Sequence, residues 1–285
     1  MSEPYDYPLG YSVLEARRLA ERGALLEPFT EDVFRRAGLG PGMRVLDIGS
    51  GVGDVSLLAA RMVGRQGAVL GIDRASSSVE TAARRAAALG FSHARFQVAD
   101  ITTFKTDEKF DALVGRLVLL YLPDPAAAVR RLSQHLRPGG IVAFQEYDRS
   151  QFSQVPAGEL FMQIKHWLLD AFVAAGTELD MGTKLYSTLV HAGLPPPSMV
   201  AATQVACGPS APEYDYPVDL LRSLLPFIER AGIATAVEVG IDTLVARLRD
   251  DAVANERVIF LPRVVGAWSK LGSAVKAEVM AAGPS

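Results

Sequence analysis

The sequence predicts an α/β fold in which helices cover both faces of a mostly parallel, doubly wound sheet. Short apolar runs with β-branched members recur between residues 44 and 145, and the first three are followed by a glycine or an acidic residue. Stretches with helical spacing of apolar residues separate these runs. A glycine-rich turn joins the first run to the first helical stretch. In such folds, ligands bind at the carboxyl ends of the strands.

The glycine-rich turn predicts a cofactor site. A buried strand is expected over residues 44–48, and Gly49, Gly51 and Gly53 follow it at alternate positions. From Asp54 onward the apolar residues share one helical face. Glycine lets the backbone approach a ligand closely, and a helix start offers unpaired N–H groups. The order strand, turn and helix therefore indicates a cradle for a cofactor.

Three acidic residues narrow the class of cofactor. A dinucleotide turn carries its third glycine at the sixth place, where this chain has Asp54. Asp47 precedes the first glycine, where it would repel a pyrophosphate but would suit a cationic amino-acid group. Asp73 closes the second apolar run about 20 residues after the turn, where an acid accepts both hydroxyls of a ribose. A nucleoside with a cationic end is expected.

Residues 40–150 resemble the cofactor half of a class I S-adenosylmethionine-dependent methyltransferase. The resemblance rests on signals in the order of that family, which include the turn Leu136–Gly140 before a fifth strand over residues 141–145. It implies that Asp47 and the turn glycines Gly49, Gly51 and Gly53 hold the methionine end of the cofactor. At the end of the second strand, Asp73 would bind the ribose and Arg74 would lie beside the adenine. Asp100 and Ile101, after the third strand, would bind the adenine, and Arg116 and Leu117, after the fourth, would lie at the sulfonium.

The same resemblance implies the rest of the architecture. It points to the bacterial small-molecule type, similar to the ubiquinone/menaquinone C-methyltransferase-like group. A seven-stranded Rossmann-like sheet is expected, with a sixth strand over residues 199–206 and a last, antiparallel strand at its edge. We expect a single domain over residues 1–285, with a helical N-terminal cap (1–40), a cofactor-binding core (41–150), a helical lid and acceptor region (151–197) and a C-terminal part of the sheet with its helices (198–271).

Composition excludes several classes of protein. The formal net charge is -3 with acids and bases interspersed, which argues against a nucleic-acid partner. Cys207 is the single cysteine, so neither an internal disulfide nor a thiolate metal site is expected, and we expect it to be buried. No apolar stretch is long enough to span a membrane, and no secretion signal is found, so a cytoplasmic location is expected. The apolar C-terminal half is compatible with a homodimer face as well as with a pocket wall.

A few further residues are candidates for contacting the cofactor or for acting as a general base. In the N-terminal segment, Tyr11 and Arg18 are candidates for reaching the cofactor, Arg18 because a guanidinium binds a carboxylate bidentately. A general base is needed only if the acceptor loses a proton, and a pocket can tune the pKa of such a group. The candidates are three consecutive residues after the fifth strand, expected to face the active-site mouth, and one histidine in the expected lid: Glu146, Tyr147, Asp148 and His166.

The expected activity is methyl transfer by in-line displacement from S-adenosylmethionine, leaving S-adenosylhomocysteine. Methylases of nucleobase amino groups carry a motif similar to Asn/Asp-Pro-Pro-Tyr after the fourth strand, where this chain has Tyr121-Leu122-Pro123-Asp124. The sequence also shows no acidic cluster of the kind that holds the metal in catechol methylases. A small, largely apolar or aromatic metabolite is favoured, within secondary metabolism, and the acceptor atom stays open between oxygen, nitrogen and carbon. The alternatives are a nicotinamide-dependent oxidoreductase and a non-catalytic S-adenosylmethionine-binding regulator.

Overall fold

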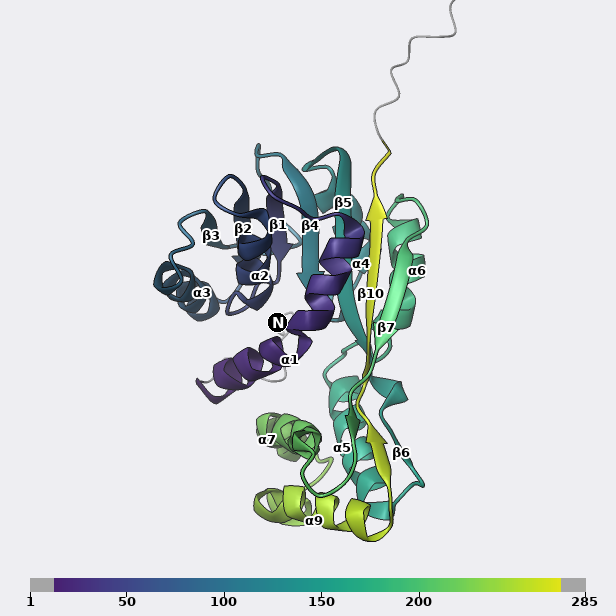
Figure 1. The fold of residues 1–285 in the computed structure, drawn as a ribbon. Coiled ribbons are helices and arrows are strands. Elements are labelled where there is room, and N and C mark those ends of the chain that lie inside the picture. The colour runs from purple at the N-terminus through teal and green to yellow at the C-terminus, as the bar shows by residue number, and fades with distance from the viewer. Residues whose placement is uncertain (1–12, 273–285) are drawn as a thin grey trace, which may run out of the picture.

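The structure, a computed structural model, describes residues 13–272, and it describes side chains from Gly23 onward with the exception of Ala24. Its main feature is a seven-stranded sheet in the order β3-β2-β1-β4-β5-β10-β7 (Figure 1). The strands of this sheet are β1 (Arg44–Ile48), β2 (Ala68–Asp73), β3 (Ala94–Val98), β4 (Phe110–Arg116), β5 (Leu136–Asp148), β7 (Ser198–Ala202) and β10 (Arg263–Lys270).

The direction of the strands confirms the predicted fold class. Strands β3, β2, β1, β4 and β5 are parallel to one another, whereas β10 runs antiparallel between β5 and β7. The antiparallel strand therefore lies one place inside the edge, and β7 forms the edge itself. The expected sixth strand is shorter than predicted, because β7 ends at Ala202 and the chain then leaves the sheet.

Helices cover both faces of this sheet, as the strand–helix alternation predicts. The helices associated with it are α1 (Val13–Ala37), α2 (Asp54–Val63), α3 (Ser76–Ala88), α4 (Pro125–Ser133) and α6 (Met181–His191), with the short turn η1 (Leu119–Tyr121) after β4. Buried residues of α1 and α2 pack on one face, where Val45 and Val69 point. Residues of α4 and α6 pack on the other face, where Leu46 points. This alternation follows from the pleat of a strand.

A second apolar cluster forms a separate layer at one end of the molecule (Figure 1). Its elements are β6 (Ser153–Val155), β8 (Val205–Ala206), β9 (Val258–Phe260), α5 (Glu159–Ala174), α7 (Asp215–Arg230), α8 (Ala236–Val239), α9 (Ile241–Ala254) and the turns η2 (Arg149–Gln151) and η3 (Pro212–Tyr214). The three strands form a small antiparallel sheet in the order β6-β9-β8. We call this layer the second lobe.

The second lobe differs from the lid expected over residues 151–197. Strand β6 and helix α5 of that region belong to it, but α6 packs on the main sheet through Met181, Leu185 and Leu189. Helices α7 and α9, expected with the sheet, pack around α5 instead. Only Leu261 and Pro262 separate β9 from β10, so consecutive strands of the chain belong to the two sheets. Cys207 is exposed, contrary to the expectation that it is buried, because it follows β8 at the surface of the lobe.

Helix α1 lies against the main sheet and reaches towards the second lobe (Figure 1). Two glycines allow its close approach. A Cβ on Gly266 of β10 would lie 2.4 Å from Val33 Cγ2, and a Cβ on Gly23 would lie 2.6 Å from the Asp54 carboxyl group at the start of α2. Ion pairs from Arg61 to Glu27 (2.8 Å) and Glu31 (3.4 Å) also join α1 to α2. The expected N-terminal helical segment is thus part of the core packing.

Candidate cofactor and acceptor site

The glycine turn after β1 adopts the left-handed backbone that its sequence predicts. Gly49, Gly51 and Gly53 have φ values of 64°, 52° and 93°, which are unfavourable for residues with a Cβ. A Cβ on Gly49 would lie 2.4 Å from Val118 Cγ2, and one on Gly53 would lie 2.9 Å from Ala82 Cβ. A Cβ on Gly51 would meet no atom of the described residues within 4 Å. The turn is therefore tightly packed at Gly49 and Gly53 and has open space at Gly51.

Asp73 joins this turn to the end of β2. Its carboxylate accepts hydrogen bonds from the backbone N–H groups of Gly51 and Ala75, each at 2.9 Å. The side chain is half-buried, so part of it faces solvent. Because β1 and β2 are adjacent and parallel, their carboxyl ends meet at the same sheet edge. The carboxylate is therefore fixed beside the open part of the turn.

Asp47 points from β1 towards α2 and is 1% exposed. Its Oδ2 accepts a hydrogen bond from Ser56 Oγ at 2.5 Å, and its buried Oδ1 has no partner among the described residues. Burial raises the pKa of this carboxyl from 3.8 to about 7, although the Ser56 bond and the positive charge of Arg116 act in the opposite direction. A cationic group beside Oδ1 would lower that pKa again.

The residues after β3 lie at the same sheet edge. Asp100 is exposed, and its Oδ1 accepts hydrogen bonds from Thr102 N (2.6 Å) and Oγ1 (2.5 Å). The Thr102 side-chain bond is the largest cause that holds the Asp100 pKa below its usual value, and the charge of nearby Arg74 adds to it. Ile101 is half-buried, and its carbonyl accepts a bond from Arg131. This part of the edge therefore offers an acid (Asp100), a cation (Arg74) and an apolar side chain (Ile101).

Arg116 closes β4 and connects the site to α1. Its Nη1 donates to Thr30 Oγ1 at 3.0 Å, and Thr30 Oγ1 in turn lies 3.0 Å from Gln145 Oε1. Thr30 and Gln145 are fully buried. Sequence reasoning missed Thr30 and Gln145, which lie 115 residues apart. Their polar character inside apolar stretches was the only signal available.

Leu117 follows with a φ of 55°, an uncommon value for a residue with a Cβ. Its N–H donates to the Gln145 carbonyl at 2.8 Å. The next two amides, of Val118 and Leu119, donate to Glu146 Oε1 at 3.0 and 2.7 Å. Three consecutive residues after β4 are thus held by β5, which fixes the loop where the resemblance expects the sulfonium.

The three consecutive candidates after residue 145 do not share a direction. Glu146 and Asp148 point to the face of the sheet covered by α6, whereas Tyr147 points to the face covered by α1. We expected all three to face the active-site mouth, but Gln145–Asp148 still belong to strand β5, in which side chains alternate. The expectation that the three side chains share one direction was therefore wrong, and a catalytic role for any of them stays a prediction.

Glu146 and Asp148 are engaged in structural contacts. Glu146 is fully buried, and burial raises its pKa from 4.5 to about 8 against the bonds from Leu119 and Val118. Asp148 is 1% exposed and accepts bonds from Thr183 N and Oγ1, both at 2.7 Å. Its Oδ2 also pairs with Arg263 at 2.6 Å. These bonds tie the start of α6 to β5 and β10.

The remaining candidates lie elsewhere. His166 is exposed on α5 of the second lobe, next to buried Trp167. Tyr11 lies outside the described residues. Arg18 belongs to the described part of α1, but its side chain lies outside the described ones. The structure therefore leaves the proposed contacts of Tyr11 and Arg18 with a cofactor untested.

An apolar wall continues from Leu117 on the α1 side of the sheet. Leu26, Tyr147 and Val264 form a buried cluster, against which Phe29 and Leu117 pack. Leu26 and Phe29 come from α1, and Val264 from β10. Tyr147 is 5% exposed. We call these five residues the apolar wall, because they adjoin the loop after β4.

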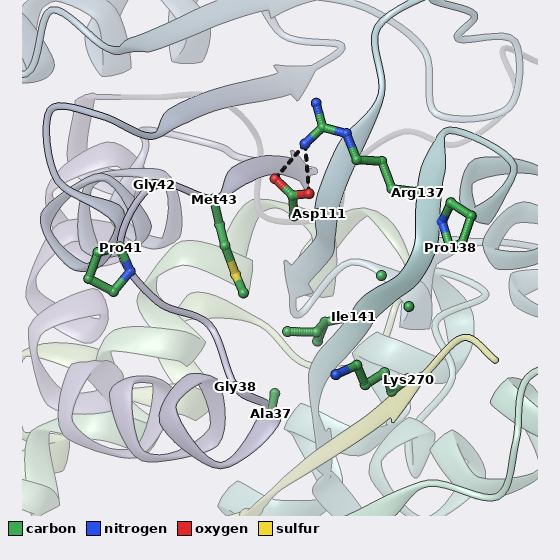
Figure 2. A pocket seen from close by; sticks show the side chains of 12 residues that line it. Ala37, Gly38, Pro41, Gly42, Met43, Asp111, Arg137, Pro138, Ile141 and Lys270 are labelled. Atoms are coloured by element: carbon green, nitrogen blue, oxygen red, sulfur yellow. Dashed lines mark hydrogen bonds and ion pairs between the residues drawn. The ribbon is translucent and has the colours of Figure 1, made fainter. Parts of the chain in front are cut away.

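A polar cleft of about 350 Å³ lies at the opposite edge of the sheet (Figure 2). Met43 before β1, Ile141 in β5 and Lys270 at the end of β10 line it. Its charged pair, Arg137 and Asp111, is joined at 2.7 Å. The cleft adjoins the amino ends of the parallel strands, so it is separate from the glycine turn.

The residues at the carboxyl edge fit the cofactor that the sequence resemblance implies. A buried, unpartnered Asp47 Oδ1 suits a cation, the open space at Gly51 suits close approach of a ligand, and the half-buried Asp73 suits ribose hydroxyls. Over residues 13–272, no group of three or more histidine, cysteine or acidic side chains could hold a metal ion. No helix within that range is both long and apolar enough to cross a membrane.

Comparisons with known proteins identify the family of this chain. A family model described as a methyltransferase domain matches residues 39–193. Phosphoethanolamine N-methyltransferase 1 of Arabidopsis thaliana is 34% identical over 137 residues, which are 48% of this chain and 27% of that protein. Aklanonic acid methyltransferase DauC of a Streptomyces species is 38% identical over 104 residues, 36% of this chain and 47% of that protein. The matches thus span less than half of each of these relatives.

Among solved structures, the YcgJ protein of Bacillus subtilis has a similar fold. The TM-score is 0.57 at 17% identity, over 86% of this chain and 99% of that chain. At this level of identity the likeness shows the fold alone.

Proposed function

Because residues 39–193 place the chain in the methyltransferase-domain family, we propose that it transfers a methyl group from S-adenosylmethionine to a small, largely apolar or aromatic metabolite. The observation that carries the choice of acceptor is the apolar wall of Leu26, Phe29, Leu117, Tyr147 and Val264. It adjoins the loop after β4, where the family resemblance locates the sulfonium. An apolar acceptor body would pack there.

The cofactor would be held by groups that already have defined positions. Asp47 would face the ammonium of the methionine end, and Asp73 would accept the ribose hydroxyls while it keeps its bond to Gly51. Asp100 and Ile101 would contact the adenine, with Arg74 beside it. The bound cofactor supplies an electrophilic methyl group on a cationic sulfur. The task of the protein is then to hold the acceptor atom in line with it.

We infer that positioning, not a general base, accounts for most of the rate enhancement. Glu146 accepts two backbone N–H bonds, Asp148 pairs with Arg263, and His166 is exposed on α5. Half-buried Arg116 bonds to buried Thr30, which bonds to buried Gln145, and this chain holds α1 and the loop after β4 in place around the acceptor. Such a site favours an acceptor that is already nucleophilic, for example an anion or an activated carbon.

The names of the relatives leave the acceptor open between two chemistries, since one is named for phosphoethanolamine and the other for aklanonic acid. The apolar wall favours the larger, apolar alternative for this chain. We also propose a role in secondary metabolism and a cytoplasmic location, where the donor is made. A homodimer remains a proposal that sedimentation analysis would test.

The test is transfer of tritium from methyl-labelled S-adenosylmethionine to a panel of acceptors. The panel contains hydroxynaphthoates, reduced naphthoquinones, flavonoid phenols, phosphoethanolamine, DNA and a protein extract. We expect label in one or more of the aromatic compounds. Label only in phosphoethanolamine or in a macromolecule would overturn the proposed acceptor class.

Two alternatives predict different results with the same protein. A non-catalytic regulator would bind S-adenosylhomocysteine and transfer label to no acceptor. A nicotinamide-dependent oxidoreductase would bind NAD and not S-adenosylhomocysteine. The acidic Asp54, which pairs with Arg85 at 2.7 Å, stands in the place of the third dinucleotide glycine and disfavours the second alternative.

A further inference from the structure

Arg149 is a buried cation, and two of its three guanidinium nitrogens lack acceptors among the described residues. It directly follows β5, and its backbone N–H donates to the Leu179 carbonyl at 2.8 Å. The residue is 5% exposed, and its buried Nε and Nη1 have no hydrogen-bond partner in the described part of the chain. A guanidinium stays charged at any physiological pH. Burial of such a group without a partner is strongly unfavourable, which calls for a reason.

Aromatic rings hold this guanidinium in place. Its central carbon lies 4.1 Å from the centre of the Phe172 ring and 5.6 Å from that of the Tyr147 ring. Phe172 belongs to α5 of the second lobe, and Tyr147 belongs to β5 of the main sheet. Cation–π contacts orient a guanidinium without using its N–H groups. Arg149 is thus fixed between the two layers while its Nε and Nη1 remain available.

The neighbouring acids do not neutralise Arg149. Asp148 is committed to Arg263 and Thr183. Glu146 is near enough to interact electrostatically with Arg149, yet its own Oε2 is buried without a partner, so the two groups do not bond. Within residues 13–272, no carboxylate whose side chain is described forms an ion pair with Arg149. A counter-charge from a ligand would satisfy it.

Arg149 lies on the acceptor side of the proposed site. Tyr147, which contacts its guanidinium, is a member of the apolar wall, and Leu117 packs against that same wall. One continuous series of contacts therefore joins Arg149 to the loop after β4. A flat apolar molecule against the wall could direct a polar substituent towards the guanidinium.

We propose that Arg149 is a specificity-determining residue that binds an anionic oxygen, such as a carboxylate or phenolate, on a flat, largely apolar acceptor. This rests on the proposed function, because the acceptor is taken to lie against the apolar wall. A charge-assisted hydrogen bond from a desolvated guanidinium is stronger than a neutral one, and its loss leaves the anion unpaired. The residue thus selects for charge while the wall selects for shape.

The test is a binding measurement that needs no turnover. The full chain, saturated with S-adenosylhomocysteine, is titrated with 2-naphthoate and with 2-naphthamide, which share one ring system and differ in charge. We expect wild type to bind the carboxylate at least about tenfold more tightly than the amide, in keeping with a charge-assisted bond. Arg149→Met should abolish this preference, and Arg149→Lys should retain part of it.

Arg222→Met is the matched control, because Arg222 pairs with Asp219 on the surface of α7 and should leave the preference unchanged. Arg149→Met should retain the wild-type affinity for S-adenosylhomocysteine and unfold at a temperature no lower than wild type, since it removes an unpaired buried charge. Equal or undetectable binding of the two probes to wild type would overturn the proposal. So would a preference that survives in Arg149→Met, or a marked loss of stability in that variant, which would indicate a structural role.

These outcomes separate the proposal from the proposed function. Methyl transfer to a neutral aromatic acceptor only, with no preference for naphthoate, would overturn the role of Arg149 and leave the methyltransferase activity standing. Absence of S-adenosylhomocysteine binding would overturn both, and the titrations with naphthoate and naphthamide would then show no ternary complex.

Discussion

The backbone N–H of Gly51 donates a hydrogen bond to Asp73 Oδ2 at 2.9 Å. This bond joins the centre of the glycine turn to the acid that ends the neighbouring strand. Both residues are singled out by the sequence, and the structure brings them into contact through the parallel pairing of β1 with β2. The turn and the acid therefore act as one unit, so that a change at either is expected to disturb the other.

Gly49→Ala should destabilise the protein more than Gly42→Ala. Both glycines have positive φ, 64° and 80°, so both variants carry a backbone penalty of about 1–2 kcal/mol. Only at Gly49 does the new Cβ meet an atom, Val118 Cγ2 at 2.4 Å, and crowding of this kind costs about 1–3 kcal/mol more. Urea denaturation of both variants measures the difference. Equal losses would show that the loop after β4 yields freely to the new methyl group.

Glu146→Gln should preserve the fold better than Glu146→Leu. Glutamine keeps an acceptor for the amides of Val118 and Leu119, whereas leucine leaves both unsatisfied at about 1–3 kcal/mol each. Affinity for S-adenosylhomocysteine, measured by calorimetry, should follow the same order because these amides shape the loop after β4. Equal behaviour of the two variants would remove the positioning role of Glu146.

The pH dependence of stability should also change in Glu146→Gln. Burial raises the pKa of Glu146 from 4.5 to about 8, so the folded protein binds this proton more tightly than the unfolded chain does. The contribution of Glu146 to stability is therefore largest below pH 4.5 and falls as pH rises towards 8. Thermal unfolding between pH 5 and 8 should show a shallower decline in Glu146→Gln than in wild type. An unchanged slope would mean that Glu146 is already ionised in the fold.

Binding of S-adenosylhomocysteine should strengthen as pH rises through about 7. Burial raises the pKa of Asp47 to about 7, and this acid must lose its proton to hold an ammonium group. Below that pH, affinity should fall by up to about tenfold per pH unit, which is the limit for one proton. Asp47→Asn should bind weakly with a flat profile from pH 6 to 8. A flat profile in wild type would show that Asp47 does not change its ionisation on binding.

Asp148→Asn should lower stability and leave catalysis nearly unchanged. Loss of the buried charge weakens its bonds to Thr183 and Arg263, at a cost of about 1–3 kcal/mol. The matched variant Asp219→Asn alters an exposed pair with Arg222 and should change stability by about 0–1 kcal/mol. Chemical denaturation and kcat are measured together. A large loss of kcat with intact stability in Asp148→Asn would restore this residue as a base.

The sheet could be predicted from the sequence because its signals are local. Most parallel strands of the cofactor half contain a short apolar run, and the turn at Gly49–Gly53 uses residue types that its backbone requires. The small sheet of β6, β8 and β9 could not be predicted, since its strands have two or three residues each and pair across long separations. Such pairings leave no periodic pattern.

The parts of the site that depend on local sequence signals could also be predicted. Asp73 and the glycines follow from their places along the chain, whereas the partners of Asp148 and Glu146 lie far away in sequence. We could not foresee that β5 extends through Asp148, and so the alternation of its side chains was missed. Arg149 carried no sequence signal, because only its burial between Phe172 and Tyr147 sets it apart.

The most direct measurement is calorimetric titration of the full chain with S-adenosylhomocysteine, in wild type, Gly51→Ala and Gly90→Ala. Both glycines have positive φ and open space around a new Cβ, so the two variants share the same backbone penalty. We predict micromolar binding in wild type and Gly90→Ala, and a loss of at least about tenfold in Gly51→Ala, where the methyl group would enter the cofactor cradle. Equal affinity in the two variants, or binding of NAD in place of S-adenosylhomocysteine, would contradict the account.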